Sequence, residues 1–213
     1  MTSDSISVLL VDDHTVVRNG VRLMLGTASD IEVTGEAETA QEALDLVQRQ
    51  DFNVALVDIA LPDRSGLDLL KLIRVKKPDL PVLMLSMYSE EIYAVRALKH
   101  GAAGYLTKNS PTATLVGAIR KAATGGKYIS PALAEQFALN VGGHPAVSHE
   151  ALSDRELEVL KLLVSGESLA AIAKTLHLSP NTVTTYRSRI CQKLRLKSNA
   201  ELTRYALEQG LLL

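Results

Sequence analysis

Two stretches, Val8-Leu9-Leu10-Val11-Asp12-Asp13 and Val54-Ala55-Leu56-Val57-Asp58, share one pattern, an apolar run followed at once by carboxylates. Short continuous apolar runs are typical of strands that are buried on both faces of a parallel sheet. If the two strands are neighbours, three carboxylates lie at one sheet edge, where like charges raise one another's pKa unless a cation compensates them. The alternative is that these acidic residues only begin the turns after the strands, as Asp often does.

Apolar runs alternate with amphipathic stretches through the first 124 residues. The pattern predicts strands at residues 7–11, 31–36, 54–57, 82–85 and 104–106. Helical spacing predicts helices at residues 16–26, 40–49, 66–76, 90–100 and 112–124. Five strand–helix repeats predict an α/β doubly wound, five-stranded parallel sheet with both faces covered. Ligands of such sheets bind beyond the carboxyl ends of the strands, where the acidic residues are expected.

The pattern changes after Gly125-Gly126. A short helix is predicted at residues 131–139, and the stretch from Val141 to Ser148 has the Gly, Pro and small residues of a flexible connector. Beyond it only helices are predicted. We therefore predict a first domain at 1–127, a short helix and linker at 128–148, and a small all-α domain at 149–213.

The predicted all-α domain contains a helix-turn-helix pattern. Ser153 and Glu156 have the spacing of a capping box at the start of its first helix. A second helix, at residues 169–176, is joined by a short turn to a third that begins at Ser179-Pro180. Two short helices joined by a tight turn are typical of DNA-binding motifs.

The third helix of this domain has one apolar and one small polar face. At 100° per residue, Val183, Ile190 and Leu194 fall on one side. The opposite side carries Thr184, Thr185, Ser188 and Gln192. From Ser179 to Lys197 the chain has five basic residues and no acidic one, which favours contact with DNA. A merely solvated helix face has a similar composition, but the preceding helix and turn favour DNA recognition over it.

Composition excludes several classes of protein. With 213 residues and 46% hydrophobic content the chain can bury a full core in one large or two small domains. The single cysteine, Cys191, permits no internal disulfide and no cysteine-based zinc site. No apolar stretch is long enough to cross a bilayer and the N-terminus has no signal-peptide pattern, so we expect a cytoplasmic protein without a membrane partner.

The order and spacing of the motifs resemble those of a known family over essentially the whole chain. The chain is similar to the two-domain response regulators of bacterial two-component systems, of the NarL/FixJ type, with a flavodoxin-like receiver and a LuxR-type helix-turn-helix domain. The receiver motifs are Val11-Asp12-Asp13-His14, Asp58 to Gly66, Ser86, and Gly104-Tyr105-Leu106-Thr107-Lys108. The second domain's motifs are Leu152 to Leu160, Leu178 to Val183, Tyr186-Arg187 and Lys193-Leu194.

The resemblance implies a function and a site for the first domain. Asp58 would accept a phosphoryl group from a sensor histidine kinase, a stoichiometric step that does not make the protein an enzyme. Mg²⁺ would be held by Asp13, Asp58 and the backbone carbonyl of Ala60, with Asp12 acting mainly through water. Lys108 and Ser86 would contact the phosphoryl group, and Tyr105 would turn inward behind it as a switch. A strand-packing role for Tyr105 stays open.

For the second domain the resemblance implies double-stranded DNA as the partner. Thr184, Thr185 and Ser188 match base-facing positions of the family. Phosphate contacts are expected from Thr182, Arg187, Arg189 and Lys193, with Lys174 on the preceding helix. Arg187 could instead pack its stem along the core. A homodimer is expected once Asp58 is phosphorylated, and RNA polymerase is a further candidate partner.

Two other function classes fit the sequence less well. An atypical response regulator could bind DNA without phosphorylation, but the complete set of Asp12, Asp13, Asp58, Ser86 and Lys108 argues against it. A phosphohydrolase of the haloacid dehalogenase type needs a second acid two residues after the nucleophile, and that position is Ala60. The sequence therefore predicts a phosphorylation-gated transcriptional regulator.

Overall fold

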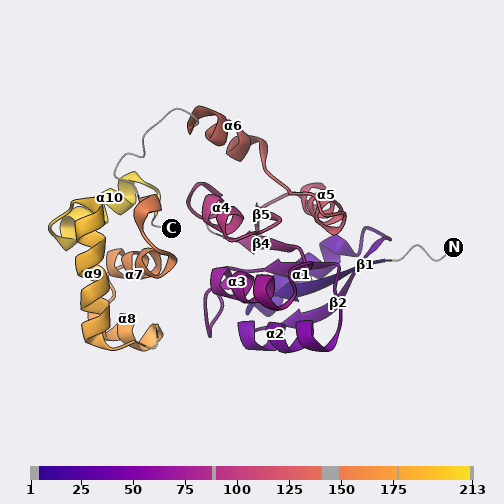
Figure 1. Cartoon of the computed structure of the whole chain (residues 1–213), viewed down its shortest axis with the longest axis horizontal. Helices are drawn as coiled ribbons and strands as arrows, with labels where there is room; N and C mark the ends of the chain where they lie inside the picture. The colour runs from indigo at the N-terminus through magenta and orange to yellow at the C-terminus, as the bar shows by residue number, and fades with distance from the viewer. Residues whose placement is uncertain (1–4, 88–89, 141–148, 177, 212–213) are drawn as a thin grey trace. The chain divides into compact units, whose positions relative to one another are not determined.

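The computed structural model describes residues 5–87, 90–140, 149–176 and 178–211, and these divide into two compact units, residues 1–140 and 141–213 (Figure 1). The predicted connector at residues 141–148 lies outside the described residues. No described helix is long and apolar enough to span a membrane.

The first unit alternates strands and helices, as its hydrophobic pattern predicts. Its strands are β1 (Ile6–Val11), β2 (Ile31–Ala37), β3 (Val54–Val57), β4 (Val82–Ser86) and β5 (Gly104–Thr107). Its helices are α1 (Thr15–Leu25), α2 (Ala40–Arg49), α3 (Gly66–Lys76), α4 (Glu90–Lys99), α5 (Thr112–Ala123) and α6 (Pro131–Asn140). All ten predicted strands and helices up to residue 124 are present, with ends that differ by at most one or two residues.

The five strands form one parallel sheet in the order β2-β1-β3-β4-β5. Right-handed crossovers place α1 and α5, which contact each other, on one face, and α2 and α3, which also contact each other, on the opposite face. Both faces are thus covered, and β3 is buried at every position. The strand order reverses between β1 and β3, so this sheet has its switch point beside Asp12 and Asp58. The predicted doubly wound fold is confirmed.

The second unit contains only helices among its described residues. They are the 3₁₀ turn η1 (His149–Ala151), α7 (Asp154–Val164), α8 (Leu169–Thr175), α9 (Pro180–Leu194) and α10 (Asn199–Glu208). Each of the four α-helices begins after a serine whose hydroxyl accepts a backbone N–H of the first turn, which satisfies an otherwise unpaired donor. These serines are Ser153, Ser168, Ser179 and Ser198.

The last helix, α10, ends before the last described residue. Apolar spacing continues to Leu211, but α10 ends at Glu208, and Gly210 adopts a left-handed conformation with φ of 62°. The backbone N–H of Leu211 then donates to the carbonyl of Ala206 at 2.8 Å, and the Leu211 side chain is buried. A glycine just after the helix closes the end and folds Leu211 back.

Candidate functional site

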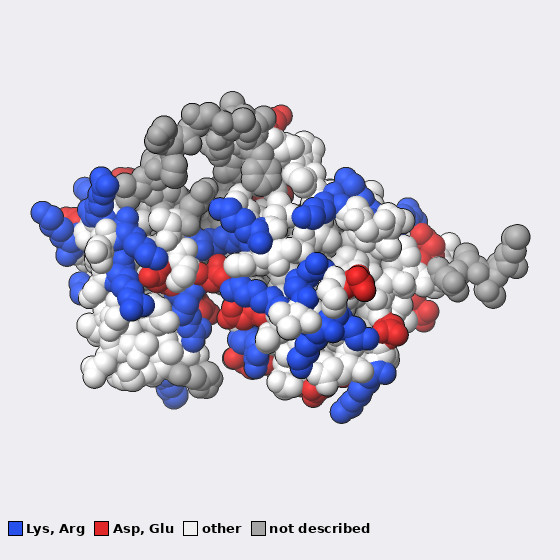
Figure 2. Space-filling model, in the orientation of Figure 1, with Lys and Arg blue, Asp and Glu red and all other residues white. Residues whose placement is uncertain are grey.

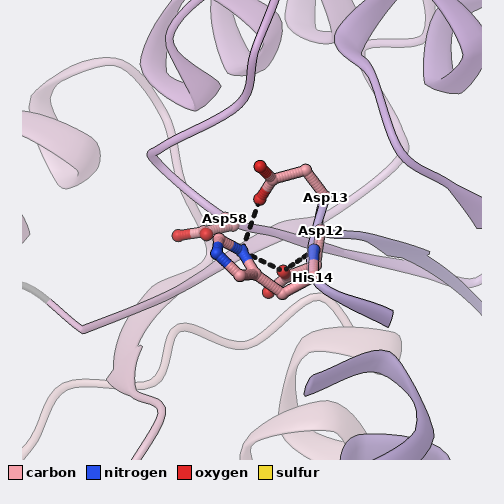
Figure 3. A group of neighbouring side chains, drawn as sticks. All are labelled: Asp12, Asp13, His14 and Asp58. Carbon is pink, nitrogen blue, oxygen red and sulfur yellow. Dashed lines mark hydrogen bonds and ion pairs between the residues drawn. The ribbon is translucent and has the colours of Figure 1, made fainter. Parts of the chain in front are cut away.

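The acidic residues that follow β1 and β3 converge at the carboxyl edge of the sheet. The ladder between the two strands brings Asp12 and Asp58 to the same level, and the backbone N–H of Asp58 donates to the carbonyl of Val11 at 2.9 Å. Figure 3 shows the carboxylates of Asp12, Asp13 and Asp58 with the imidazole of His14. One ligand atom from each of these four residues lies within 4.8 Å of the other three.

Lys108 brings a cation to this acidic edge. It follows β5 directly, and its Nζ lies 2.6 Å from Asp12 Oδ2 and 2.6 Å from Asp58 Oδ2. The Lys108 side chain is only 8% exposed. Its backbone N–H donates to the carbonyl of Ser86 at 2.9 Å, which ties the ends of β4 and β5 together. One buried ammonium is thus shared between two buried carboxylates.

The charges at this edge are not balanced. Burial raises the pKa of Asp58; the hydrogen bond and charge of Lys108 oppose this rise, and the nearby charge of Asp12 adds to it. Burial would lower the pKa of Lys108, but its hydrogen bonds to Asp12 and Asp58 raise it above its ordinary value. A further cation placed among the carboxylates would relieve the strain on Asp58.

Ser86 and Tyr105 lie next to this edge in the interior. Ser86 is the last residue of β4, and Tyr105 pairs in register with Met84 in the middle of β5. Both side chains are buried, with 1% of each residue exposed. The sequence left open where the Tyr105 ring lies, and in the structure it is inside the protein.

In the second unit, the helix-turn-helix consists of α8 and α9. Val183, Ile190 and Leu194 of α9 are buried, as the helical spacing predicts. Thr184, Thr185 and Ser188 are exposed, and the predicted division of the helix into two faces is therefore confirmed.

The hydroxyls on the exposed face of α9 are engaged with the helix backbone. Each donates to the carbonyl four residues earlier, over 3.0 Å for Thr184 and Thr185 and 3.1 Å for Ser188. Each hydroxyl oxygen can still accept a hydrogen bond, and all three residues are exposed. On the face drawn in Figure 2, Lys and Arg side chains gather over the α9 and α10 part of this unit. Small outward side chains beside cations suit the approach of a helix to a DNA groove.

The comparisons with known proteins agree with both sites. The family described as response regulator receiver domain matches residues 8–120, and the luxR family of bacterial regulatory proteins matches residues 150–206. The chain is a two-component response regulator. It carries a LuxR-type DNA-binding domain, and its family is one of transcriptional regulators.

Similar proteins cover nearly the whole length of this response regulator. Response regulator GacA of Pseudomonas viridiflava is 36% identical over 209 residues, which cover 97% of each chain. Response regulator UvrY of Escherichia coli K12 is 36% identical over 208 residues, which cover 97% of this chain and 95% of UvrY. A structure of RcsB from Salmonella enterica serovar Typhimurium, bound to promoter P1flhDC in the presence of phosphomimetic BeF₃⁻, has a TM-score of 0.72 and 26% identity. That match covers 94% of this chain and 98% of RcsB.

Receiver domains of this family normally bind Mg²⁺ at their acidic residues, and the side chains of this response regulator fit such an ion. Three carboxylates offer the oxygen ligands that Mg²⁺ prefers. Within the described part of the chain, the buried Asp58 Oδ1 accepts no hydrogen bond, so an oxygen is available where a cation would compensate it. The Asp58 Oδ2 atom, by contrast, already meets Lys108.

The five predicted phosphate-contacting residues fall into two groups in the structure. Lys174 on α8 and Arg189 on α9 are exposed. The other three are at least partly exposed but contact neighbouring residues of the same domain: Thr182 Oγ1 lies 2.8 Å from the capping Ser179 Oγ, Arg187 Nε donates to Asn199 Oδ1 at 2.7 Å, and Lys193 Nζ meets Glu156 Oε2 at 2.6 Å.

Glu156 has a larger role than its capping box suggests. Its carboxylate accepts the backbone N–H of Ser153 at 2.7 Å, which completes the capping box of α7, and the same Oε2 meets Lys193 of α9. Burial would raise the pKa of Glu156, but Lys193 and the hydrogen bonds with Ser153 lower it below the ordinary range. This pair was not predictable from the sequence, because nothing local links residues so far apart in the chain.

Two features of the loop between β3 and α3 were also missed. A Cβ atom on Gly66 would lie 1.9 Å from the carbonyl oxygen of Asp58, so only glycine lets α3 start this close to the site. Asp63 accepts the backbone N–H groups of Ala40 and Gln41 at 2.9 and 3.0 Å, so the loop is fixed to the start of α2. The close approach of α3 could have been predicted from the glycine, Gly66, that stands eight residues after Asp58.

Proposed function

We propose that this response regulator is a phosphorylation-gated DNA-binding transcriptional regulator whose receiver accepts a phosphoryl group on Asp58. One observation carries the proposal. Asp58 is buried at the switch point of the sheet with Oδ1 free of hydrogen bonds from the described residues, while a lysine and two further carboxylates surround it. An acid that only began a turn would face solvent.

The chemistry is a transfer between two side chains. A lone pair of an Asp58 carboxylate oxygen attacks the phosphorus of a phosphohistidine on the partner kinase, and a P–O bond forms. The P–N bond breaks, its electron pair stays with the imidazole nitrogen, and that nitrogen takes up a proton. The aspartyl side chain then holds the phosphoryl group as an acyl phosphate. Transfer of this kind depends mainly on positioning and on neutralising the phosphoryl charge.

Residues of the acidic edge supply both requirements. Asp12, Asp13, Asp58 and the backbone carbonyl of Ala60 would hold Mg²⁺, which when bound neutralises charge on the phosphoryl oxygens. Lys108 would exchange part of its contact with Asp12 and Asp58 for a phosphoryl oxygen, as a mobile point charge can. The Ser86 hydroxyl would donate to another phosphoryl oxygen from the end of β4. The buried Tyr105 ring would occupy the space behind Ser86 once Ser86 moves toward the phosphoryl group.

The output is DNA binding by the second unit. We propose that phosphorylation favours a homodimer that sets two α9 helices on half-sites about one helical turn apart. The structure of RcsB bound to a promoter in the presence of a phosphomimetic supports this link between phosphorylation and DNA binding for a similar protein. Thr184, Thr185 and Ser188 would face the bases, and Lys174 and Arg189 the phosphates. Contact with RNA polymerase would follow at the promoter.

The test is a comparison of DNA affinity with and without a phosphodonor. A palindromic site enriched from random DNA is titrated with wild type, with Asp58→Ala, and with the matched control Asp51→Ala, an exposed acid of the same unit paired with Lys77. Acetyl phosphate plus Mg²⁺ should tighten binding by wild type and by the control on the order of 10-fold, the usual range of such coupling. Equal tightening in Asp58→Ala would overturn the proposal.

A further inference from the structure

We infer that Arg18 is a positioning residue: it fixes the backbone of the acidic loop, residues 12–14, in the conformation that lets Asp12 and Asp13 hold a cation together with Asp58. The inference rests on the proposed function, because it concerns the same cation site. It assigns a role to a residue of α1 that touches none of the three carboxylate groups.

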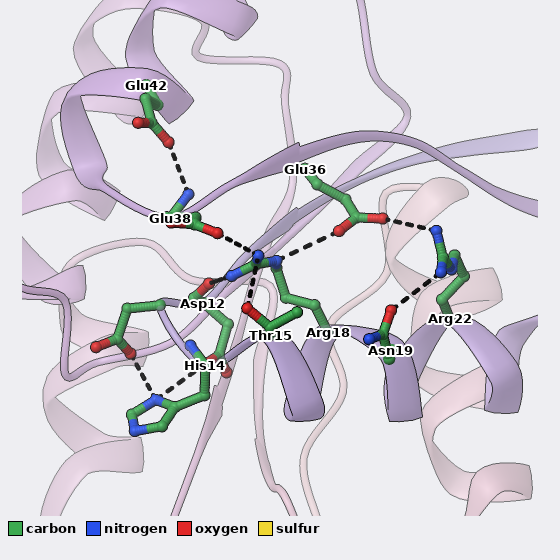
Figure 4. Close-up of polar contacts among 10 residues, drawn as sticks. Asp12, His14, Thr15, Arg18, Asn19, Arg22, Glu36, Glu38 and Glu42 are labelled. Carbon is green, nitrogen blue, oxygen red and sulfur yellow. Dashed lines mark hydrogen bonds and ion pairs between the residues drawn. The ribbon is translucent and has the colours of Figure 1, made fainter.

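Arg18 is buried, which is rare for an arginine. Its side chain is 8% exposed, and it lies on the buried stripe of α1 together with Val21 and Leu25. The Nη1 atom donates to the backbone carbonyl of Asp12 at 2.6 Å, so the guanidinium holds the loop by its main chain (Figure 4). A charged group in such a position is retained only if its donors are satisfied.

Three of the remaining four N–H donors of Arg18 are directed to residues at and just after the end of β2 and to α1 itself. Nε donates to Glu36 Oε2 at 3.3 Å, and Nη2 donates to Glu38 Oε1 and, at 3.4 Å, to Thr15 Oγ1. Two carboxylates therefore compensate the guanidinium charge, and four of the five N–H donors of the group are engaged with these partners and the Asp12 carbonyl. The planar fork of arginine is suited to such a set of partners, whereas lysine presents one point charge.

These contacts join the acidic loop to two other segments. Glu38 precedes α2, and its backbone N–H donates to Glu42 Oε2 at 2.8 Å in the first turn of that helix. The end of β2 and the start of α2 are thus a fixed support for Arg18 (Figure 4). The Asp12 backbone N–H also donates to the carbonyl of Ala37 at 3.1 Å, so both polar groups of the Asp12 main chain are tied to this side.

The support matters because Asp12 and Asp13 lie beyond the end of β1, outside the ladder. On the opposite side of the main chain, Asp12 Oδ1 accepts the N–H of His14 at 2.9 Å and Asp12 Oδ2 meets Lys108. Arg18 holds the carbonyl while these contacts hold the side chain, so the direction of the carboxylate is determined from both ends. Groups that orient metal ligands in this way typically change metal affinity 10- to 100-fold when removed.

The test measures cation affinity in the full chain. Mn²⁺ binding is followed by electron paramagnetic resonance, with Mg²⁺ as competitor, for wild type, Arg18→Lys and Arg18→Met. Arg22→Met is the matched control, since Arg22 meets the same Glu36 at 3.5 Å but is 59% exposed and does not touch the loop. We expect the Mn²⁺ dissociation constant to rise on the order of 10-fold in both Arg18 variants and to stay at the wild-type value in the control.

Three outcomes are distinguishable. If folded Arg18→Lys and Arg18→Met bind Mn²⁺ like wild type, the inference is overturned and the proposed function stands. If wild type itself binds no Mn²⁺ that Mg²⁺ displaces, the cation site fails and both fall together. Should both Arg18 variants fail to fold by circular dichroism, Glu38→Gln serves instead, because it loosens the half-exposed end of the network and leaves Arg18 in place. Unchanged Mn²⁺ affinity in Glu38→Gln would then overturn the inference.

Discussion

Asp58 in the first unit and Glu156 in the second are both carboxylates of 3% exposure that meet a lysine at 2.6 Å, yet their pKa values move in opposite directions. Burial is the largest influence on each and raises both. For Asp58 that rise prevails, whereas for Glu156 the surrounding donors more than offset it. An ion-pair distance by itself therefore says little about what a buried carboxylate contributes.

The difference lies in how the lysine and the remaining donors are shared. Lys108 divides its ammonium between Asp58 and Asp12, and the charge of Asp12 acts against ionisation of Asp58. Among the described residues Lys193 pairs with one carboxylate, and Glu156 also accepts the backbone N–H of Ser153 within the capping box. The cluster of Asp12, Asp58 and Lys108 has two carboxylates for one ammonium, and we call it the open cluster. The cluster of Glu156, Lys193 and Ser153 has balanced charges and paired hydrogen-bonding groups, and we call it the closed cluster. A site that binds a cation and a phosphoryl group must keep carboxylate oxygens unpaired until they bind. An ion pair that only joins α7 to α9 can have all its groups paired.

The largest effect on stability is expected from removing the Glu156 carboxylate from the closed cluster. Glu156→Ala removes both the capping-box acceptor and the partner of Lys193, and we expect it to lower the stability of the second unit by about 2 kcal/mol. Glu156→Gln keeps an acceptor for Ser153 and loses only the ion pair, so it should cost roughly half as much. Hydrogen exchange of the α7 and α9 amides in the full chain measures both. Equal protection in all three proteins would show that Glu156 does not join α7 to α9.

The same pair predicts a pH dependence with a definite sign. Because the pKa of Glu156 in the folded protein lies below its ordinary value of 4.5, its stabilising contribution is complete above that value and is lost as pH falls through the lower, folded-state pKa. The difference in exchange protection between wild type and Glu156→Gln should therefore shrink on acidification below 4.5. A difference that grew on acidification would mean that the pKa of Glu156 in the folded protein is raised and not lowered.

The open cluster should respond in the opposite direction. Asp58→Asn removes a buried charge whose ionisation is disfavoured, and Lys108 keeps its 2.6 Å contact with Asp12. We expect the first unit to gain about 1 kcal/mol, as often happens when a strained functional group is removed. Hydrogen exchange of the β1, β3 and β4 amides, measured without divalent cations, tests it. A loss of stability would mean that Asp58 is held as favourably as Glu156.

How much of this was predictable from sequence differs between the strands and the side-chain networks. The parallel sheet followed from runs such as Val54–Val57, since buried strands and covering helices leave distinct periodicities. The convergence of Asp12, Asp58 and Lys108 followed as well, because parallel strands end at one edge. Contacts that run across the fold leave no such local pattern.

Arg18 and Lys193 show where sequence reasoning stopped. Arg18 interrupts the apolar stripe of α1 that includes Val21 and Leu25, and a buried arginine at that spacing was a usable signal for a network. Its acidic partners, Glu36 near the end of β2 and Glu38 just after it, were not predictable, because they depend on the pairing register of β1 and β2, which shifts between Val8 and Leu9. Lys193 has the spacing of a cation beside the outward face of α9, which favoured a phosphate contact, and only the packing of α7 reveals its carboxylate partner.

The finest distinction is between two cations on the same helix. Arg189 is exposed on α9, whereas Lys193 is paired with Glu156. If Arg189 contacts a DNA phosphate, Arg189→Met should weaken binding and reduce the slope of log affinity against log salt by about 1. Lys193→Met should lower the protection of the α7 and α9 amides and leave the salt slope as in wild type. The titrations use the same enriched site under phosphodonor and Mg²⁺. A reduced salt slope in Lys193→Met would mean that Lys193 leaves Glu156 to contact DNA. The ion pair between Lys193 and Glu156 would then break on DNA binding.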